Sequence, residues 1–304
     1  MRSVVLVLLA AVLFGTTGTA QALGAPGIDP LSLGSARIVV GGLALAVVAA
    51  ARRHPGRPAP GMRAVGDRKG TIVTLLVGAG GVVAYQPAFF LGTERNGVAV
   101  GTLVALGSAP LMTGLLAWML ERRFPGIRWS VATAVAVLGL VLLGGGGIPG
   151  AGADAVGLAG SLAAGVSYAV YAVMSKRLLD AGWTGASAMG AVFGTGALVS
   201  LALLLTTDIR WLLTGPGALA TLWLGLATVC VAYLLYAAGL RSLSAASVST
   251  LTLAEPLTAA ILGLLVLGEM LTAPSWMGLT AIALGILILV ARPRRPVAVP
   301  GLGV

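Results

Sequence analysis

Long apolar runs alternate with short polar connections over the whole chain. Most runs hold about 20 residues, the length that an α-helix needs to cross the roughly 30 Å hydrocarbon core of a bilayer. The pattern therefore predicts an all-α membrane protein with ten transmembrane helices. The predicted spans cover residues 4–23, 33–51, 71–91, 98–120, 129–143, 155–173, 186–206, 218–238, 246–267 and 276–291.

The composition agrees with this pattern. Of the 304 residues, 58% are hydrophobic and only 9% are charged, whereas about a quarter of the residues in a soluble domain are charged. Cys230 is the only cysteine and His54 the only histidine. A single cysteine excludes an intramolecular disulfide and any metal site built from several cysteines. We therefore expect neither a cofactor nor a metal ion.

The net charge of +10 raises the question of nucleic-acid binding. The positions of the charges favour a different explanation. If the amino terminus is cytoplasmic and the helices alternate in direction, all of the 19 lysines and arginines except Arg37, Arg95 and Arg210 lie on the cytoplasmic side. This asymmetry follows the positive-inside rule. It predicts two cytoplasmic termini, a multi-pass protein of the inner (plasma) membrane, and the lipid bilayer as partner in place of nucleic acid.

An internal repeat is visible at low similarity, with residues 101–143 resembling residues 247–289. Each copy forms the fourth and fifth helix of a five-helix half, and an odd number of spans places the two halves in opposite orientations. We expect two inverted five-helix repeats, residues 1–147 and 148–292, followed by a short cytoplasmic tail, residues 293–304. Chance similarity between two apolar segments is the alternative. The matched residues are Pro110 with Pro256, Gly139 with Gly285 and, two residues out of register, Glu121 with Glu269.

Several short motifs resemble the ten-helix branch of the drug/metabolite transporter superfamily, the EamA-type permeases. The motif that carries most of the resemblance is Leu253-Ala254-Glu255-Pro256, followed by Gly263 and by Leu267-Gly268-Glu269. Helix 4 departs from this pattern because it ends as Met119-Leu120-Glu121. The resemblance implies export or exchange of small metabolites, often amino acids, or of toxic compounds. The other matching residues are Ala10-Ala11-Val12-Leu13-Phe14-Gly15-Thr16-Thr17, Pro30, Arg37 and Gly107-Ser108-Ala109-Pro110.

Glu255 is the one acidic residue well inside an apolar run. A carboxylate in the membrane costs several kcal/mol unless it is protonated, paired or hydrated. Such a residue suits a transporter that binds and releases a proton, and a structural carboxylate bonded to nearby backbone is the alternative. Arg37, near the outer end of the second helix, could hold a substrate carboxylate in a two-pronged geometry. It could also extend to the outer headgroups or pair with Glu255.

Polar and aromatic side chains within the spans are further candidates for a substrate site. Tyr168 and Tyr171 are three residues apart and share a helix face, and Tyr233 repeats this spacing with Tyr236. Most such tyrosines pack between helices, which is the alternative here. Prolines remove a backbone donor and kink helices, so some could act as hinges. The candidates are Tyr85, Gln86, Tyr168, Tyr171, Tyr233 and Gln21 for the site, and Pro87, Pro110 and Pro256 for the hinges.

These observations favour a secondary active transporter that works by alternating access and is coupled to protons. The chain contains no Walker motif, and it lacks the G-x-S-x-G and H-E-x-x-H motifs of hydrolytic sites. We therefore expect a protein without enzymatic activity, which acts on a small-molecule substrate as a monomer or homodimer. A membrane-embedded enzyme, a passive channel and a lipid flippase are the competing interpretations.

Overall fold

The computed structural model describes residues 1–52, 68–144, 154–268 and 270–291, and every regular element in these ranges is helical. The predicted tail, the predicted boundary between the halves, and Glu269 lie outside the described residues. The first half of the chain contains α1 (Arg2–Gly15), α2 (Thr17–Gly24), α3 (Pro30–Ala51), α4 (Arg68–Glu121) and α5 (Ile127–Leu143). The second half contains α6 (Ala155–Asp180), α7 (Gly185–Leu204), the 3-10 turn η1 (Arg210–Leu213), α8 (Gly215–Leu222), the π-helix η2 (Trp223–Val231), α9 (Ala232–Leu240), α10 (Ala245–Leu251), α11 (Ala254–Val266) and α12 (Ala273–Val290).

Most of these helices are long enough to span a membrane, either alone or as consecutive helices that form one span. Within the described ranges, 9 stretches are long and apolar enough to cross a membrane, and α5 is an apolar helix of 17 residues, at the short end of the roughly 17–25 residues that can span. Three spans consist of consecutive helices, namely α1 with α2, α8 with η2 and α9, and α10 with α11. Conversely, α4 holds two spans that meet at Gly97, whose φ of 78° and ψ of 156° are not helical. The all-α membrane fold predicted from the sequence is therefore confirmed.

Short polar residues start several of the helices. The carboxylate of Asp29 accepts hydrogen bonds from the backbone N–H groups of Leu31 and Ser32, ahead of Pro30 in the first turn of α3. Asp154 caps α6 and Thr184 caps α7 in the same way. These side chains satisfy backbone donors that a helix leaves free at its amino end.

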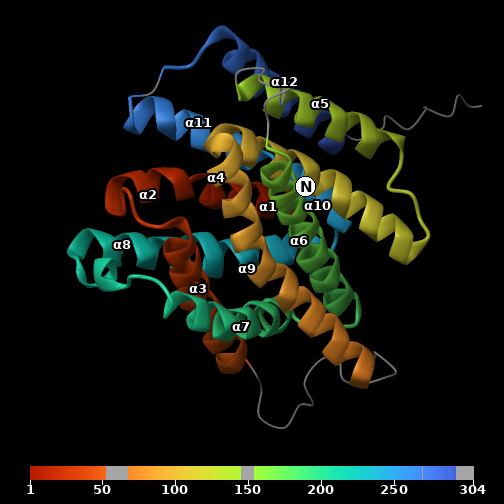
Figure 1. Ribbon diagram of the computed structural model, residues 1–304. Helices are drawn as coiled ribbons and strands as arrows, with labels where there is room; N and C mark the ends of the chain where they lie inside the picture. The colour runs from red at the N-terminus through yellow and green to blue at the C-terminus, as the bar shows by residue number, and fades with distance from the viewer. Residues whose placement is uncertain (53–67, 145–153, 269, 292–304) are drawn as a thin grey trace, which may run out of the picture.

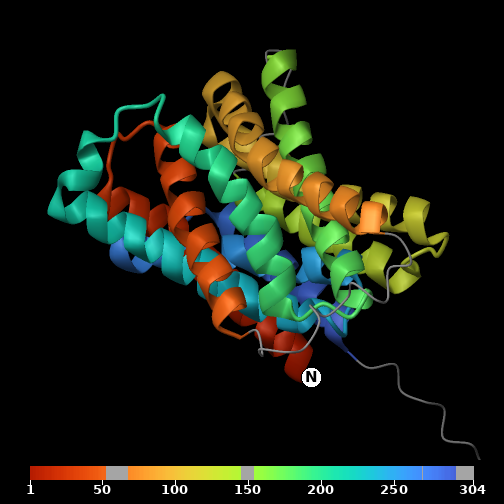
Figure 2. The ribbon, with the colours of Figure 1, turned by 90° about the horizontal axis from the view of Figure 1, so that it is seen from below.

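The helices pack in antiparallel pairs that join the two halves of the chain. Arg128, at the start of α5, donates from Nε to the carbonyl oxygen of Ile288 at the end of α12. The hydroxyl of Ser275, at the start of α12, donates to the carbonyl oxygen of Leu143 at the end of α5. Figure 1 shows α5 and α12 side by side, and Figures 1 and 2 show α3 beside α7 from two directions. The fifth helices of the two halves therefore run in opposite directions.

Glycines set how closely these pairs approach, and their surroundings are symmetric. A Cβ on Gly190 of α7 would meet the carbonyl oxygen of Leu45 and the Cβ of Ala49 on α3. A Cβ on Gly42 of α3 would meet the equivalent two atoms, the carbonyl oxygen of Phe193 and the Cβ of Ala197 on α7. Residues 148 apart thus exchange roles. Helices approach this closely where small residues line the interface.

The pair formed by α5 and α12 repeats this symmetry. A Cβ on Gly139 would meet Gly278 and Ile282, and a Cβ on Gly285 would meet Ala132 and Ala136. Here residues 146 apart exchange roles, the same spacing that relates Gly139 to Gly285 in the sequence repeat. Two separate helix pairs therefore have contacts that map onto themselves when the halves are exchanged.

Two faces of the bundle can be distinguished by the ends of its helices. The end of α9 packs against the start of α1, where Gly239 approaches Val7 and the carbonyl oxygen of Ser3. We call this end the basic face, because the sequence places most basic residues there. At the opposite face, Trp211 donates to the hydroxyl of Ser32 at 2.9 Å, which joins η1 to the start of α3.

Candidate functional site

A cavity of about 170 Å³ lies inside the bundle, in the half toward the opposite face. Its wall at that end comes from α2 and the start of α3, including Gln21, Pro30 and Gly34. Besides Gln21, seven other side chains predicted for the substrate or proton site line it. They are Arg37, Tyr85, Gln86, Tyr168, Tyr171, Tyr233 and Glu255. These residues come from five separate helices, so the structure brings together groups that are far apart in the sequence.

Glu255 reaches the cavity from a break in the ninth span. The helix is interrupted between α10 and α11 at Thr252 and Leu253, and Pro256 follows Glu255 in the first turn of α11. A proline has no N–H to donate to the carbonyl four residues earlier, and the carbonyl of Thr252 instead accepts from the N–H of Glu255 at 2.9 Å. In the described part of the chain, the Glu255 carboxylate has no hydrogen bond or ion pair. It is half-buried and free to bind a proton, a cation or a substrate.

Arg37 lines the same cavity from α3 without forming an ion pair with Glu255. Its side chain is half-buried, and its Nε is fully buried with no hydrogen-bond partner. A buried donor left unpaired costs about 1–3 kcal/mol. The cavity is therefore lined by a guanidinium and a carboxylate that form no ion pair with each other.

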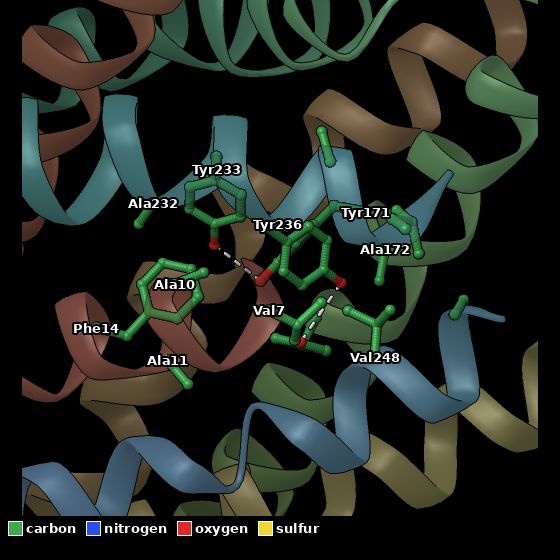
Figure 3. Close-up of a cluster of buried hydrophobic side chains, with 14 of the residues drawn as sticks. Val7, Ala10, Ala11, Phe14, Tyr171, Ala172, Ala232, Tyr233, Tyr236 and Val248 are labelled. Carbon is green, nitrogen blue, oxygen red and sulfur yellow. Dashed lines mark hydrogen bonds between the residues drawn. The ribbon is translucent and has the colours of Figure 1, made fainter. Parts of the chain in front are cut away.

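Four tyrosines form two hydrogen-bonded pairs between α6 and α9. The hydroxyls of Tyr171 and Tyr233 lie 2.9 Å apart, and those of Tyr168 and Tyr236 lie 3.4 Å apart. Tyr168 also bonds the hydroxyl of Thr252 at 3.0 Å, which connects the pairs to the break in the ninth span. Figure 3 shows Tyr171, Tyr233 and Tyr236 close together, with Val7 and Val248 nearby. We call these four residues the tyrosine layer.

The tyrosine layer closes the cavity toward the basic face. Side chains on that side are almost entirely buried and mostly apolar. They leave no described opening between the layer and the start of α1. This tightly packed set contains Val7, Ala10, Ala11, Ala172, Val248 and Leu251.

Tyr85 has a different environment from the tyrosine layer. Its ring stacks on Phe89 with centroids 5.7 Å apart and an interplanar angle of 10°. In contrast to the layer, its hydroxyl has no hydrogen bond among the described residues. Gln86, next to it, is buried beside Gly34. Tyr85 thus presents an unpaired hydroxyl to the cavity.

Several lining residues were not predicted as site residues. Phe89 follows Tyr85 by four residues on the same helix face, a spacing that could have indicated it. Phe193 packs against Tyr233 with centroids 4.1 Å apart and the rings tilted by 45°, and only the folded chain brings these two together. Together they make much of the cavity wall aromatic. The lining residues missed from the sequence include Phe14, Thr17, Phe89, Phe90, Thr102 and Phe193.

The three candidate hinge prolines differ in their surroundings. The helix continues through Pro87 and Pro110 within α4, where Pro87 is exposed and Pro110 is buried. Only Pro256 stands at an interruption of a span. A second interruption, at Thr16 between α1 and α2, contains no proline; there the Thr16 hydroxyl donates to the carbonyl oxygen of Leu13 at 2.7 Å. Neither Thr16 nor any of the three prolines lines the cavity.

A polytopic helical bundle with a polar and aromatic cavity at its centre has the general form of a membrane transport protein. The EamA-like transporter family matches residues 1–145 and again residues 155–291. The chain belongs to this family. It is a multi-pass membrane transporter of the drug/metabolite transporter type, as the sequence motifs had indicated.

One curated relative supports this assignment, and one solved structure has a similar fold. The uncharacterized transporter YwfM of Bacillus subtilis (strain 168) is 36% identical over 289 residues, which cover 95% of this chain and 94% of that protein. A protein of known crystal structure shares the fold with a TM-score of 0.76 at 20% identity, over 95% of this chain and 96% of that one. The likeness to the crystal structure concerns the fold alone.

Proposed function

We propose that this chain is a secondary active transporter that exports or exchanges small metabolites, such as amino acids, or toxic compounds, by alternating access coupled to protons. The observation that carries the proposal is a cavity that is lined by both Glu255 and Arg37, whose side chains form no hydrogen bond or ion pair in the described residues. A binding site near the middle of the membrane, between two halves, is the usual position in secondary transporters.

The two charged groups have different roles in this proposal. Arg37 binds a substrate carboxylate, which would satisfy its unpaired Nε and form charge-assisted bonds. Glu255 binds the coupling proton, because a carboxylate held away from water must be neutralised, paired or hydrated. The cavity volume of about 170 Å³ suits a metabolite of modest size.

The symmetric helix contacts support two inverted repeats as the moving parts. The pairs α3 with α7 and α5 with α12 keep equivalent contacts when the halves are exchanged. Residues 1–147 and 148–292 would then rock against each other around the cavity, with Pro87, Pro110 and Pro256 as hinges. The tyrosine layer closes one end of the cavity, as alternating access requires of each of its two states.

Counterflow in proteoliposomes tests this function. Vesicles loaded with an unlabelled metabolite mixture should take up a labelled member of that mixture transiently above its equilibrium level, because an alternating-access carrier exchanges solute across the membrane. Amino acids and other small carboxylates are the first solutes to screen. Equilibration without overshoot would indicate a channel, and a chemically altered solute would indicate an enzyme; either result would refute the proposal.

The proposed orientation in the inner (plasma) membrane places both termini in the cytoplasm. In a Cys230→Ala background, Arg210→Cys should react with an impermeant maleimide added to intact cells, whereas Arg123→Cys should react only after lysis. Both side chains are exposed, so the position of the residue relative to the membrane decides its labelling. Equal labelling of both cysteines in intact cells would contradict this topology.

A further inference from the structure

Tyr85 and Tyr233 occupy equivalent positions in the two halves of the chain. Tyr85 ends the tripeptide Val83-Ala84-Tyr85 in the third span, and Tyr233 ends Val231-Ala232-Tyr233 in the eighth. The two tripeptides are 148 residues apart. The same spacing relates the contacts of Gly42 to those of Gly190 in the neighbouring pair α3 and α7. The tripeptides therefore align these tyrosines at the spacing that the packing of α3 on α7 also has.

The two tyrosines are in opposite bonding states. Tyr233 is bonded to Tyr171 of the sixth span at 2.9 Å, on the closed side of the cavity. Tyr85 lines the same cavity and has no hydrogen bond in the described residues. Exchange of the halves replaces the sixth span by the first, so a partner for Tyr85 is expected on α1 or α2. The polar cavity-lining side chains there are Thr17 and Gln21, which also lack hydrogen bonds in the described chain.

We propose that Tyr85 and Tyr233 are the two symmetry-related members of a double gate. When the cavity is closed toward the basic face, Tyr233 bonds Tyr171 and Tyr85 is free, as observed. When the cavity opens toward the basic face, the first pair separates and the Tyr85 hydroxyl bonds Thr17 or Gln21 across the other mouth. This inference rests on the alternating access proposed above, and it adds the residues that hold each end shut.

The proposal has a thermodynamic consequence. A bond made in only one of two states favours that state, whereas a bond made in both shifts nothing. Loss of the Tyr233 hydroxyl should therefore favour opening toward the basic face, and loss of the Tyr85 hydroxyl should disfavour it. If a tyrosine only fills space, its replacement by phenylalanine keeps the packing and does not change the equilibrium between the two states.

The experiment measures the accessibility of one buried position. Val248 is fully buried on the basic-face side of the tyrosine layer, and Val248→Cys in a Cys230→Ala background provides a single thiol. Its alkylation by a hydrophilic maleimide is followed in lipid nanodiscs, where both faces are exposed and no substrate is required. We expect Tyr233→Phe to raise the alkylation rate and Tyr85→Phe to lower it. Each change should be about threefold to tenfold, because the net free energy of one hydrogen bond corresponds to that range. Tyr171→Phe should act like Tyr233→Phe.

Thr280→Val is the matched control, because it removes an exposed hydroxyl that bonds only its own helix; it should leave the rate unchanged. The double gate is wrong if Tyr85→Phe and Tyr233→Phe change the alkylation rate in the same direction, or if neither substitution changes it. Opposite shifts support it even if proteoliposomes show no counterflow, in which case the proposed transport cycle fails separately. Intact counterflow with unchanged alkylation would refute the gate alone.

Discussion

Replacing Glu255 with glutamine is expected to abolish proton-driven accumulation of substrate while leaving exchange in place. The amide has nearly the shape of the carboxyl group but cannot bind and release a proton. The Glu255 carboxylate forms no hydrogen bond or ion pair in the described residues whose loss would disturb the fold, so the variant should remain folded. With a substrate found by counterflow, accumulation driven by a pH gradient should fall by at least about tenfold, since coupling requires a group that is protonated in only part of the cycle.

Glu94→Gln is the matched control for this measurement. Glu94 is exposed near the end of the third span and does not line the cavity. The same change of charge there should leave both accumulation and counterflow unaltered. Accumulation that persists in Glu255→Gln would rule out Glu255 as the proton site, and a folded variant that loses counterflow as well would assign Glu255 to substrate binding.

Replacing Gly190 with alanine is expected to lower the stability of the protein substantially for the addition of a single methyl group. A Cβ at this position would lie 2.6 Å from the Cβ of Ala49 and 2.7 Å from the carbonyl oxygen of Leu45. The backbone of α3 cannot move aside without separating the two halves. Overpacking of this kind costs about 1–3 kcal/mol, which should lower the unfolding temperature in detergent by several degrees.

Gly80→Ala provides the control, because no atom lies within 4 Å of a Cβ placed there. It should leave the unfolding temperature unchanged or raise it slightly, since alanine favours helix over glycine by roughly 1 kcal/mol. Gly42→Ala should be as destabilising as Gly190→Ala if the contacts of the two halves are equivalent. An unfolding temperature of Gly190→Ala equal to that of Gly80→Ala would contradict the close packing of α3 on α7.

The repeat extends further than the sequence comparison alone suggested. The match at 101–143 with 247–289 was weak because apolar segments resemble one another whatever their origin. Contacts are more selective, since an equivalent glycine must meet equivalent atoms in the other half. The packing of Gly42, Gly190, Gly139 and Gly285 satisfies this condition in two helix pairs. The tripeptides that end in Tyr85 and Tyr233 gain significance only in that context.

The sequence by itself determined the membrane class, the positions of the spans and the residue types available for a site. These features are local: a helix must be about 20 apolar residues long to cross the bilayer, and polar groups within such a run are conspicuous because lipid cannot solvate them. Only the tertiary structure decided that Arg37 and Glu255 share a cavity without forming an ion pair and that Phe193 packs against Tyr233. It also decided that Tyr233 is hydrogen-bonded while the Tyr85 hydroxyl has no hydrogen bond in the described residues. These facts depend on how separate helices meet, and side-chain packing across 150 residues of sequence leaves no local pattern from which to predict it.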